Sequence, residues 1–437
     1  MHKINDNMSL YSGGNVKENF DKNYNFMKPK NCLKIEIVEN AIIMPFRAPD
    51  FGGVFTHDHK LVELSITSNS NFLENRNSDI FYSWGGKFDE ELIKSEKLQY
   101  IDEEVVHIGP IHGSYGLFLL ETLSRMWFFL NDENKKYKIT YTDGADNSDY
   151  WFKFFELLGL KKEQFVKIEK PVSFKKVIIP EQSFRLSDYM APEFLDVFNA
   201  IKKDVPAAKY EKIYFSKTKW VASTSVFGEK AIEQIFKKNG YKIFYPEKLS
   251  IKEQISLLKG CKKFAGIAGT NTHNNLFAAD GIECYYLMRT PDICSPQILI
   301  DKNKNFKVSY IESFIDIFPT LTTGMPCLVG PTQYLIDFFN DNNFKYSYKT
   351  FFRDANKNLW EFIKNYIAYA PNHKTYGGDN YFVDNKLSIR EFAGNFNNLL
   401  SIYPIGIFEN KLGKTTKKIR KTISILGIKI SYKKKVK

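Results

Sequence analysis

The sequence predicts an α/β fold with two domains that face a cleft. Three observations support this prediction. The 437 residues are enough for two or three domains at roughly 100–200 residues each. Hydrophobic residues make up 43% of the chain, which is typical of a protein with a buried core. Segments with the apolar period of a strand alternate with segments that have the period of a helix, and this pattern indicates parallel sheets covered by helices.

The first half of the chain begins with expected strands. Between about 31 and 70, two segments, 33–39 and 62–67, alternate and are β-branched, which predicts antiparallel strands. Strands then alternate with helices, and we expect an N-terminal α/β domain over residues 31–205. Its further predicted elements are strand 104–109, helix 115–130, strand 137–142, helix 150–158 and strand 176–180.

A second alternating block predicts a C-terminal Rossmann-like domain over residues 206–320. Sheets of this kind bind ligands at the carboxyl ends of their strands. An aromatic-rich, helical extension is expected over 321–413. The predicted elements of both regions are strand 212–216, helix 229–239, strand 241–246, helix 250–259, strand 263–268, helix 272–279, strand 282–287 and helices 333–340, 359–369 and 389–400.

Both ends of the chain are polar. Residues 1–30 are rich in Asn and Lys without the apolar stretch of a signal peptide, so we expect a polar N-terminal arm. Residues 414–437 contain ten Lys and Arg and no Asp or Glu, so this tail carries most of the net charge of +12. Basic charge confined to a tail disfavours a nucleic-acid enzyme, in which basic residues cover a folded face.

The tail also has an apolar pattern. Ile419, Ile423 and Leu426 recur at spacings of four and three, so a helix would place them on one face. A basic amphipathic segment of this kind binds anionic membranes, whereas a disordered solubilising tail is the alternative. No stretch approaches the ~18 apolar residues of a membrane span. We therefore expect a cytoplasmic protein, peripheral on the inner face of the cytoplasmic membrane.

The cysteines and acidic residues predict no metal site. Five scattered cysteines disfavour a disulfide framework and a zinc site, and they favour a reducing compartment. Asp143 and Asp146 have the wrong spacing for an Asp-x-Asp metal motif, and His57 and His59 are expected to be exposed. We therefore expect chemistry without a metal.

The most informative segment follows the strand expected at 263–268. Gly269 allows a tight turn, and Thr270 and the free N–H groups of the next helical turn would face the cleft. That arrangement suits a diphosphate, and His273 and Asn274 would add donors beside it. An ordinary capped strand-to-helix turn is the alternative.

Four motifs follow one another in a familiar order. They are Gly116-Leu-Phe-Leu-Leu-Glu-Thr-Leu-Ser-Arg-Met-Trp, Lys212-Ile-Tyr-Phe-Ser-Lys-Thr-Lys, Gly240-Tyr-Lys-Ile-Phe-Tyr-Pro-Glu-Lys-Leu-Ser-Ile-Lys-Glu-Gln and Ala265-Gly-Ile-Ala-Gly-Thr-Asn-Thr-His-Asn-Asn-Leu-Phe. Over about residues 100 to 290 the chain resembles glycosyltransferase family 61, which includes bacterial capsular polysaccharide enzymes. The resemblance implies a GT-B fold of two Rossmann-like domains. It also implies a nucleotide-sugar donor and inverting transfer, without an obligatory metal, onto a surface or lipid-linked glycan.

The resemblance assigns donor-site residues. The family's Tyr-Ile-Ser-Arg strand end falls on residues 214–217, so Ser216 and Lys217 would contact the donor, although lysine lacks the fork geometry of arginine. The family's Glu-Gln pair falls on Glu253 and Gln254. Ser250 to Glu253 also matches a capping box, which would simply close a helix N-terminus.

Two departures from the family concern the imidazoles. Its Gly-His-Phe reads Gly-Leu-Phe at 116–118, and its His-Gly-Ala-Gly turn reads Ala-Gly-Thr-Asn at 268–271. The missing imidazoles would be supplied by His112 and His273, or proton transfer differs in this subgroup.

Glu121 is the favoured catalytic base, with Arg125 one helical turn further on. Inverting transfer needs a group that takes the proton of the acceptor hydroxyl. Arg125 could equally pair with Glu121 as a structural i,i+4 contact. His112 is the second candidate for the base, and Lys217 with His273 would neutralise the leaving diphosphate.

Two other classes of protein stay open. One is a different carbohydrate-pathway transferase, such as a polysaccharide pyruvyltransferase, for which a nucleotide would not be the donor. The other is a non-enzymatic protein that docks on membranes through its basic tail.

Overall fold

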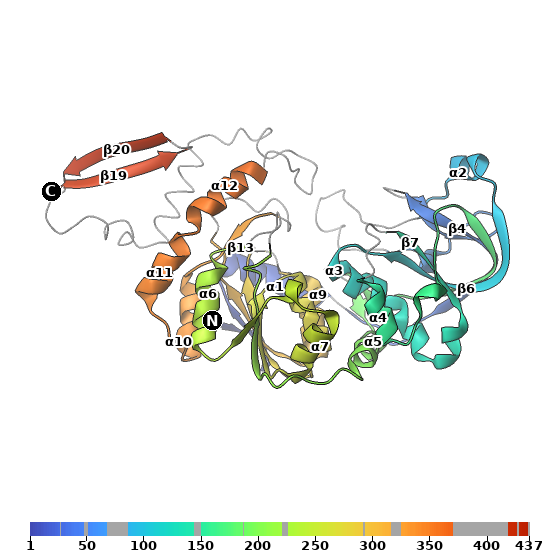
Figure 1. The fold of residues 1–437 in the computed structure, drawn as a ribbon, viewed down its shortest axis with the longest axis horizontal. Coiled ribbons are helices and arrows are strands. Elements are labelled where there is room, and N and C mark those ends of the chain that lie inside the picture. The colour runs from blue at the N-terminus through green and yellow to red at the C-terminus, as the bar shows by residue number, and fades with distance from the viewer. Residues whose placement is uncertain are drawn as a thin grey trace.

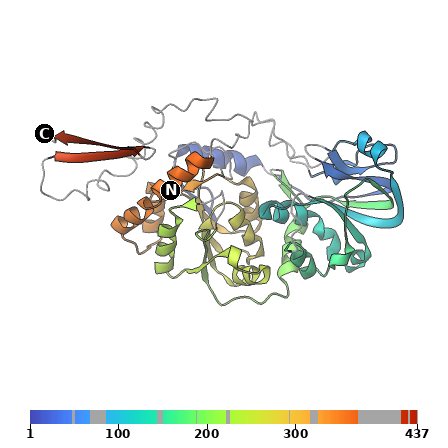
Figure 2. The ribbon, with the colours of Figure 1, turned by 45° about the horizontal axis from the view of Figure 1, so that its top comes forward.

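The computed structural model describes most of the chain. The residues outside the description are 27, 48–50, 68–85, 144–149, 187, 221–225, 292, 316–324, 370–417, 426–427 and 436–437. Two large sheets lie side by side along the long axis of the molecule, with helices α3, α4 and α5 between them (Figures 1 and 2). The predicted α/β class with parallel sheets is confirmed.

A seven-stranded sheet forms the C-terminal half, in the order β1-β2-β17-β16-β15-β12-β14. Every neighbouring pair is parallel except β1 and β2. Helices cover both faces, with α1, α7 and α9 on one and α6, α10 and α11 on the other. The bounds are β1 (His2–Lys3), β2 (Met8–Tyr11), α1 (Gly14–Phe26), β12 (Lys212–Phe215), α6 (Glu229–Lys238), β14 (Lys242–Phe244), α7 (Ile251–Gly260), β15 (Lys263–Ile267), α8 (Thr270–His273), β16 (Glu283–Met288), α9 (Ser295–Asn303), β17 (Lys307–Glu312), α10 (Gln333–Asp341) and α11 (Tyr348–Asn356).

The arm predicted for residues 1–30 is instead folded, because β1 and β2 belong to this sheet and α1 packs on it. β2 pairs in parallel with β17, from Met8 opposite Val308 to Tyr11 opposite Ile311. Leu10 and Phe20 are fully buried. A few apolar residues at the right spacing therefore outweigh the Asn- and Lys-rich composition that suggested an arm.

A six-stranded sheet forms the other half, in the order β5-β4-β9-β6-β7-β8. β4 pairs antiparallel with β5 and β9, whereas β6 to β9 pair in parallel with one another where they are neighbours. The bounds are β4 (Ile35–Arg47), β5 (Phe51–Phe55), α2 (Glu90–Ser95), β6 (Gln99–Ile111), α3 (Tyr115–Leu117), β7 (Lys138–Asp143), α4 (Phe152–Leu157), β8 (Phe165–Lys167), β9 (Val172–Pro180) and α5 (Pro192–Lys202).

Two predictions in this half need correction. The antiparallel strand expected at 33–39 is confirmed as the start of β4, but that at 62–67 is wrong. It forms a 3-10 turn at Glu63–Ser65, because the Ser65 hydroxyl donates to Val62 O at 2.7 Å and accepts from Val54 N at 2.9 Å. The helix expected at 115–130 starts as α3 but continues as a π-helical turn (Phe118–Thr122) and a 3-10 helix (Leu123–Leu130).

A shared apolar core joins the two halves. One cluster contains buried residues of both sheets and of the helices between them. Within it, the ring of Phe277, from the C-terminal half, lies 6.1 Å from that of Phe154 and 5.2 Å from that of Phe198. The site between the sheets is therefore built on a packed junction.

The C-terminal region differs from the prediction at its end. α10 and α12 (Leu359–Tyr369) confirm two of the expected helices, whereas 389–400 lies outside the described residues. The helix expected around Ile419 is wrong, because β19 (Lys418–Ile425) and β20 (Ile428–Lys435) form an antiparallel pair that aligns Ile423 with Ile430. The isoleucines favour a strand, and Gly427 lies between the two strands. Among the described helices, none is long and apolar enough to cross a membrane.

Candidate active site

A cavity of about 610 Å³ lies where the two halves meet. One wall comes from segments 113–115 and 150–151 of the N-terminal half. The other comes from residues at the carboxyl ends of β12, β14, β15 and β16 in the C-terminal half. This is the edge at which parallel α/β sheets bind ligands. Five of the predicted donor-site residues line it: Ser216, Lys217, Gln254, Thr270 and Asn274.

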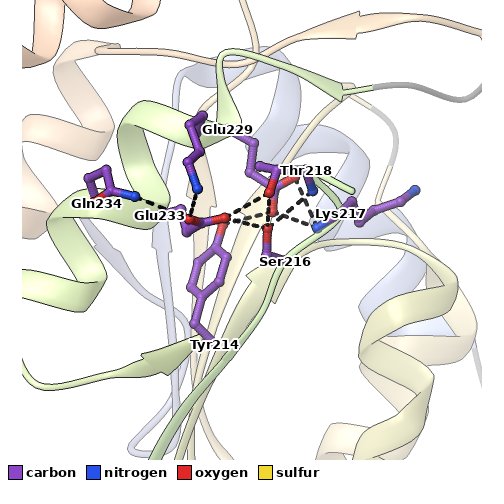
Figure 3. Close-up of polar contacts among 8 residues, drawn as sticks. Tyr214, Ser216, Lys217, Thr218, Glu229, Glu233 and Gln234 are labelled. Atoms are coloured by element: carbon purple, nitrogen blue, oxygen red, sulfur yellow. Dashed lines mark hydrogen bonds and ion pairs between the residues drawn. The ribbon is translucent and has the colours of Figure 1, made fainter. Parts of the chain in front are cut away.

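Two carboxylates of α6 hold the end of β12 (Figure 3). Glu229 accepts hydrogen bonds from the Tyr214 hydroxyl at 3.1 Å and from the backbone N–H of Lys217 at 3.0 Å. Glu233, one helical turn later, accepts from the hydroxyls of Ser216 and Thr218, both at 2.8 Å. The backbone at 216–218 is therefore fixed, and the Lys217 side chain extends away from both carboxylates (Figure 3).

Two cationic side chains line the cavity. Burial, together with the nearby positive charge of Arg289, lowers the pKa of Lys217 to about 8. Arg289 directly follows β16, and its Nη1 is buried without a hydrogen-bond partner among the described residues. Two cations that repel each other in a partly dry cavity favour an anionic ligand.

The turn after β15 needs glycine at one position. Gly269 has φ 122° and ψ −153°, a conformation that residues with a Cβ rarely adopt. The Asn271 side-chain amide then donates to Phe215 O at 3.0 Å, which ties the turn to the end of β12. The helix predicted at 272–279 is only a four-residue α8 followed by a 3-10 turn, so its dipole is small. The side-chain cations of Lys217 and Arg289 would therefore contribute more than this helix to the binding of an anion.

His273 lies behind the cavity wall. Its Nδ1 is 2.8 Å from Gln297 Oε1, and its Nε2 is 3.7 Å from Cys294 Sγ. Burial lowers its pKa to about 4, so the imidazole is neutral at pH 7 and does not supply the expected positive charge. Contact of His273 with the donor stays a prediction.

The predicted Glu-Gln pair is divided between two roles. Glu253 forms the capping box of α7, because its Oε2 accepts from the Ser250 N–H at 2.7 Å and its own N–H donates to Ser250 Oγ at 3.3 Å. Gln254 lines the cavity, and its amide donates to Pro246 O at 3.0 Å. The structural alternative therefore accounts for Glu253.

The candidate base has a different partner from the one expected. Glu121 Oε2 lies 3.0 Å from His112 Nε2, and both side chains are almost fully buried. Arg125 does not pair with Glu121; its guanidinium donates to the carbonyl oxygens of Pro180 and Ile66. The π-helical turn at 118–122 shifts the phase between residues 121 and 125, which separates them. His112 directly precedes the cavity-lining segment 113–115.

Several lining residues were not predicted from the sequence. Arg289 could have been found, because it lies two residues after the strand expected at 282–287. Tyr115, Trp151 and Glu247 gave no such signal, since only the packing of the two halves brings them together. Tyr115 donates to Asn274 Oδ1 at 2.5 Å and thereby links the two walls.

The fold and site together define an α/β protein with a cationic cavity at the carboxyl ends of its parallel strands. The sequence of residues 115–285 matches the family model Glycosyltransferase 61. This region belongs to glycosyltransferase family 61, and the chain is a glycosyltransferase. The resemblance inferred from the motifs is confirmed.

The comparison with solved structures adds little. The bacterial iron-containing dodecameric glycosyltransferase TibC from enterotoxigenic E. coli is 10% identical, with a TM-score of 0.27, over 66% of this chain and 84% of that one. So weak a likeness carries no argument about how the halves are arranged. No curated protein matches the sequence. In the described part of the chain, no three His, Cys, Asp or Glu are grouped as a metal site requires, and metal independence stays a prediction.

Proposed function

We propose that the cavity binds a nucleotide-sugar donor and that the enzyme transfers the sugar, with inversion and without a metal, to a glycan acceptor. The two halves would then act as the donor and acceptor domains of a GT-B enzyme. The observation that carries the proposal is the presence of Lys217 and Arg289 at the carboxyl ends of β12 and β16, both lining one cavity.

The diphosphate is the part of the donor that these cations fit. As the sugar leaves, negative charge grows on the diphosphate, and fixed cations in a dry site stabilise that charge. The nucleoside would lie towards β14, where Glu247 and Gln254 line the cavity. Glu247 Oε1 is buried without a hydrogen-bond partner in the described structure and would accept from an N–H or O–H of the nucleoside.

The acceptor would enter from the N-terminal half, and its hydroxyl would lose a proton to the His112–Glu121 pair. This assignment uses both predicted candidates as one unit. His112 would take the proton, and the negative charge of Glu121, 3.0 Å away, would stabilise the imidazolium that forms. Transfer with inversion requires the base on the side opposite the leaving diphosphate, and the pair belongs to that half of the molecule.

The acceptor itself is proposed to be a capsular or lipopolysaccharide-type surface glycan of a bacterium, lipid-linked at the cytoplasmic membrane. The family resemblance and the basic C-terminal tail support this part of the proposal.

The test is a ligand panel with one matched pair of variants. Calorimetry with UDP-, GDP- and CMP-sugars and with phosphoenolpyruvate identifies the donor class, and nucleotide release measures turnover. Lys217→Met should weaken donor binding and reduce transfer by an amount equivalent to about 2–4 kcal/mol. Lys219→Met removes an exposed lysine two residues away and should change neither. If phosphoenolpyruvate binds and no sugar nucleotide does, the protein would instead be a pyruvyltransferase.

A further inference from the structure

Three buried polar atoms of cavity-lining residues have no hydrogen-bond partner in the described structure. They are Trp151 Nε1, Glu247 Oε1 and Arg289 Nη1. Buried polar groups are nearly always paired, so unpaired ones that gather at one cavity indicate a missing ligand. Arg289 and Glu247 belong to the wall assigned above to the diphosphate and nucleoside. Trp151 belongs to the facing wall and needs a separate explanation.

The Trp151 ring is packed against other aromatic rings, so its unpaired indole N–H is the group that needs a partner. Only 7% of the residue is exposed. Phe118 stacks on the indole with 4.6 Å between ring centroids, and Tyr150 meets it edge-on at 5.1 Å. These contacts leave no open ring face for a sugar. An indole nitrogen can only donate, so the group it lacks is an acceptor oxygen.

The position of Trp151 indicates which oxygen that is. The diphosphate would lie against Lys217 and Arg289, and the nucleoside would extend along the same sheet edge towards β14. The transferred sugar, joined to the second phosphate, and the acceptor are then the only parts of the reacting pair that face the N-terminal wall. Both carry hydroxyl oxygens.

We propose that Trp151 is a specificity-determining residue that donates its Nε1–H to a carbohydrate hydroxyl of the transferred sugar or of the acceptor. The inference rests on the proposed function and deepens it. An enzyme of this kind prefers a sugar with an oxygen at that position over a deoxy analogue, because the analogue leaves the buried N–H unpaired.

The test separates binding of the sugar from binding of the nucleotide. Trp151→Phe removes the N–H and keeps an aromatic ring. Its affinity for the nucleoside diphosphate should stay within about twofold of wild type, while its affinity for the sugar nucleotide should fall about five- to tenfold. If the acceptor supplies the oxygen, donor affinity stays constant and the KM for the acceptor rises by that factor.

The matched control is Trp127→Phe. The Trp127 indole donates to Glu181 O at 2.8 Å, so its loss should lower stability and leave the ratio of the two affinities unchanged. The indole N–H resonance of Trp151, assigned by its absence from the Trp151→Phe spectrum, should shift with the sugar nucleotide or the acceptor and much less with the diphosphate alone.

Two results would overturn the inference in distinguishable ways. In the first, wild type binds sugar nucleotides, but Trp151→Phe lowers the affinities for the nucleoside diphosphate and the sugar nucleotide equally, or changes neither these affinities nor the KM for the acceptor. If the Trp151 resonance also does not move, this inference alone fails. If wild type binds no nucleotide at all, the proposed function fails and takes this inference with it.

Discussion

The protonation of Lys217 should make donor affinity depend on pH. Its pKa of about 8 lies below the ordinary 10.5, so it is charged at pH 7 and loses its proton as pH rises through about 8. If the charged form binds the diphosphate, donor affinity should fall between about pH 7 and pH 9. Lys217→Arg should remove most of this dependence, because a guanidinium stays charged. Calorimetric Kd values at three pH values for both proteins test this. An identical pH profile in the variant would exclude Lys217 as the titrating group.

Two measurements on one preparation distinguish a catalytic role of Glu121 and His112 from a structural one. Glu121→Gln keeps the shape of the side chain but takes no proton at neutral pH, so donor binding should persist while turnover falls about 10²–10⁴-fold. His112→Ala should behave similarly. The double variant should be little worse than either single one, since the pair acts as a unit. A lower melting temperature with an unchanged rate per folded molecule would instead assign both residues to the core.

Helix α9 carries a buried network of polar side chains that connects it to the neighbouring strands. Asp301 accepts hydrogen bonds from Gln297 at 2.8 Å, from Tyr286 at 2.9 Å and from Tyr310 at 2.5 Å. Gln297 in turn contacts His273, so α9 holds α8 and the cavity wall that α8 contributes. The network therefore links the back of the sheet to the proposed donor side of the cavity.

This network predicts a pH-dependent stability. Burial raises the pKa of Asp301 to about 7 from an ordinary 3.8, so the folded state binds a proton that the unfolded state releases at lower pH. Its contribution to the free energy of unfolding is present below about pH 4 and is lost as pH rises to about 7. Asp301→Asn should therefore reduce the fall in stability between these values, as measured by urea unfolding. Burial also raises the pKa of Glu229 to about 7. Glu229→Gln should therefore reduce the same fall in stability by a second, independent amount.

At the scale of the whole molecule, the C-terminal tail is proposed to bring the enzyme to its acceptor. It contains ten Lys and Arg within residues 414–437, and each basic residue near an anionic surface contributes about 1 kcal/mol. Deletion of 414–437 should release the protein from anionic liposomes in a sedimentation assay, as should raised salt. Activity on a soluble acceptor analogue should survive. Equal liposome binding with and without the tail would refute this role, and loss of activity on the analogue would make the tail part of the fold.

The antiparallel pair of β19 and β20 replaces the helix expected for the tail and leaves this test unchanged. A helix would have grouped Ile419 with Ile423 by their spacing, whereas the strand pair aligns Ile423 with Ile430 and Ile425 with Ile428 across two strands. Spacings of four and of two both occur in this short segment, so its period alone could not decide between helix and strand.

Local sequence patterns were enough to predict many of the helices and strands and the edge of the sheet at which the cavity lies. Alternating strand and helix periods predicted four of the seven strands of the C-terminal sheet, β12, β14, β15 and β16. Parallel strands place their carboxyl ends together, which brought Ser216, Lys217, Gln254 and Thr270 to one cavity. The ordered motifs also identified the glycosyltransferase family. These features depend on residues that are close together in the chain, so the sequence pattern is enough to predict them.

Contacts between residues far apart in the chain became known only from the folded structure. The pairing of Met8 with Val308, the contact of Glu121 with His112 and the facing position of Trp151 depend on packing between segments far apart in the chain. Charge state was decided in the same way, because burial neutralises His273 and lowers the pKa of Lys217, and a sequence does not show the burial of a side chain. Desolvation and long-range packing are properties of the folded interior, so the chemistry of the site could be assigned only after the two halves were in place.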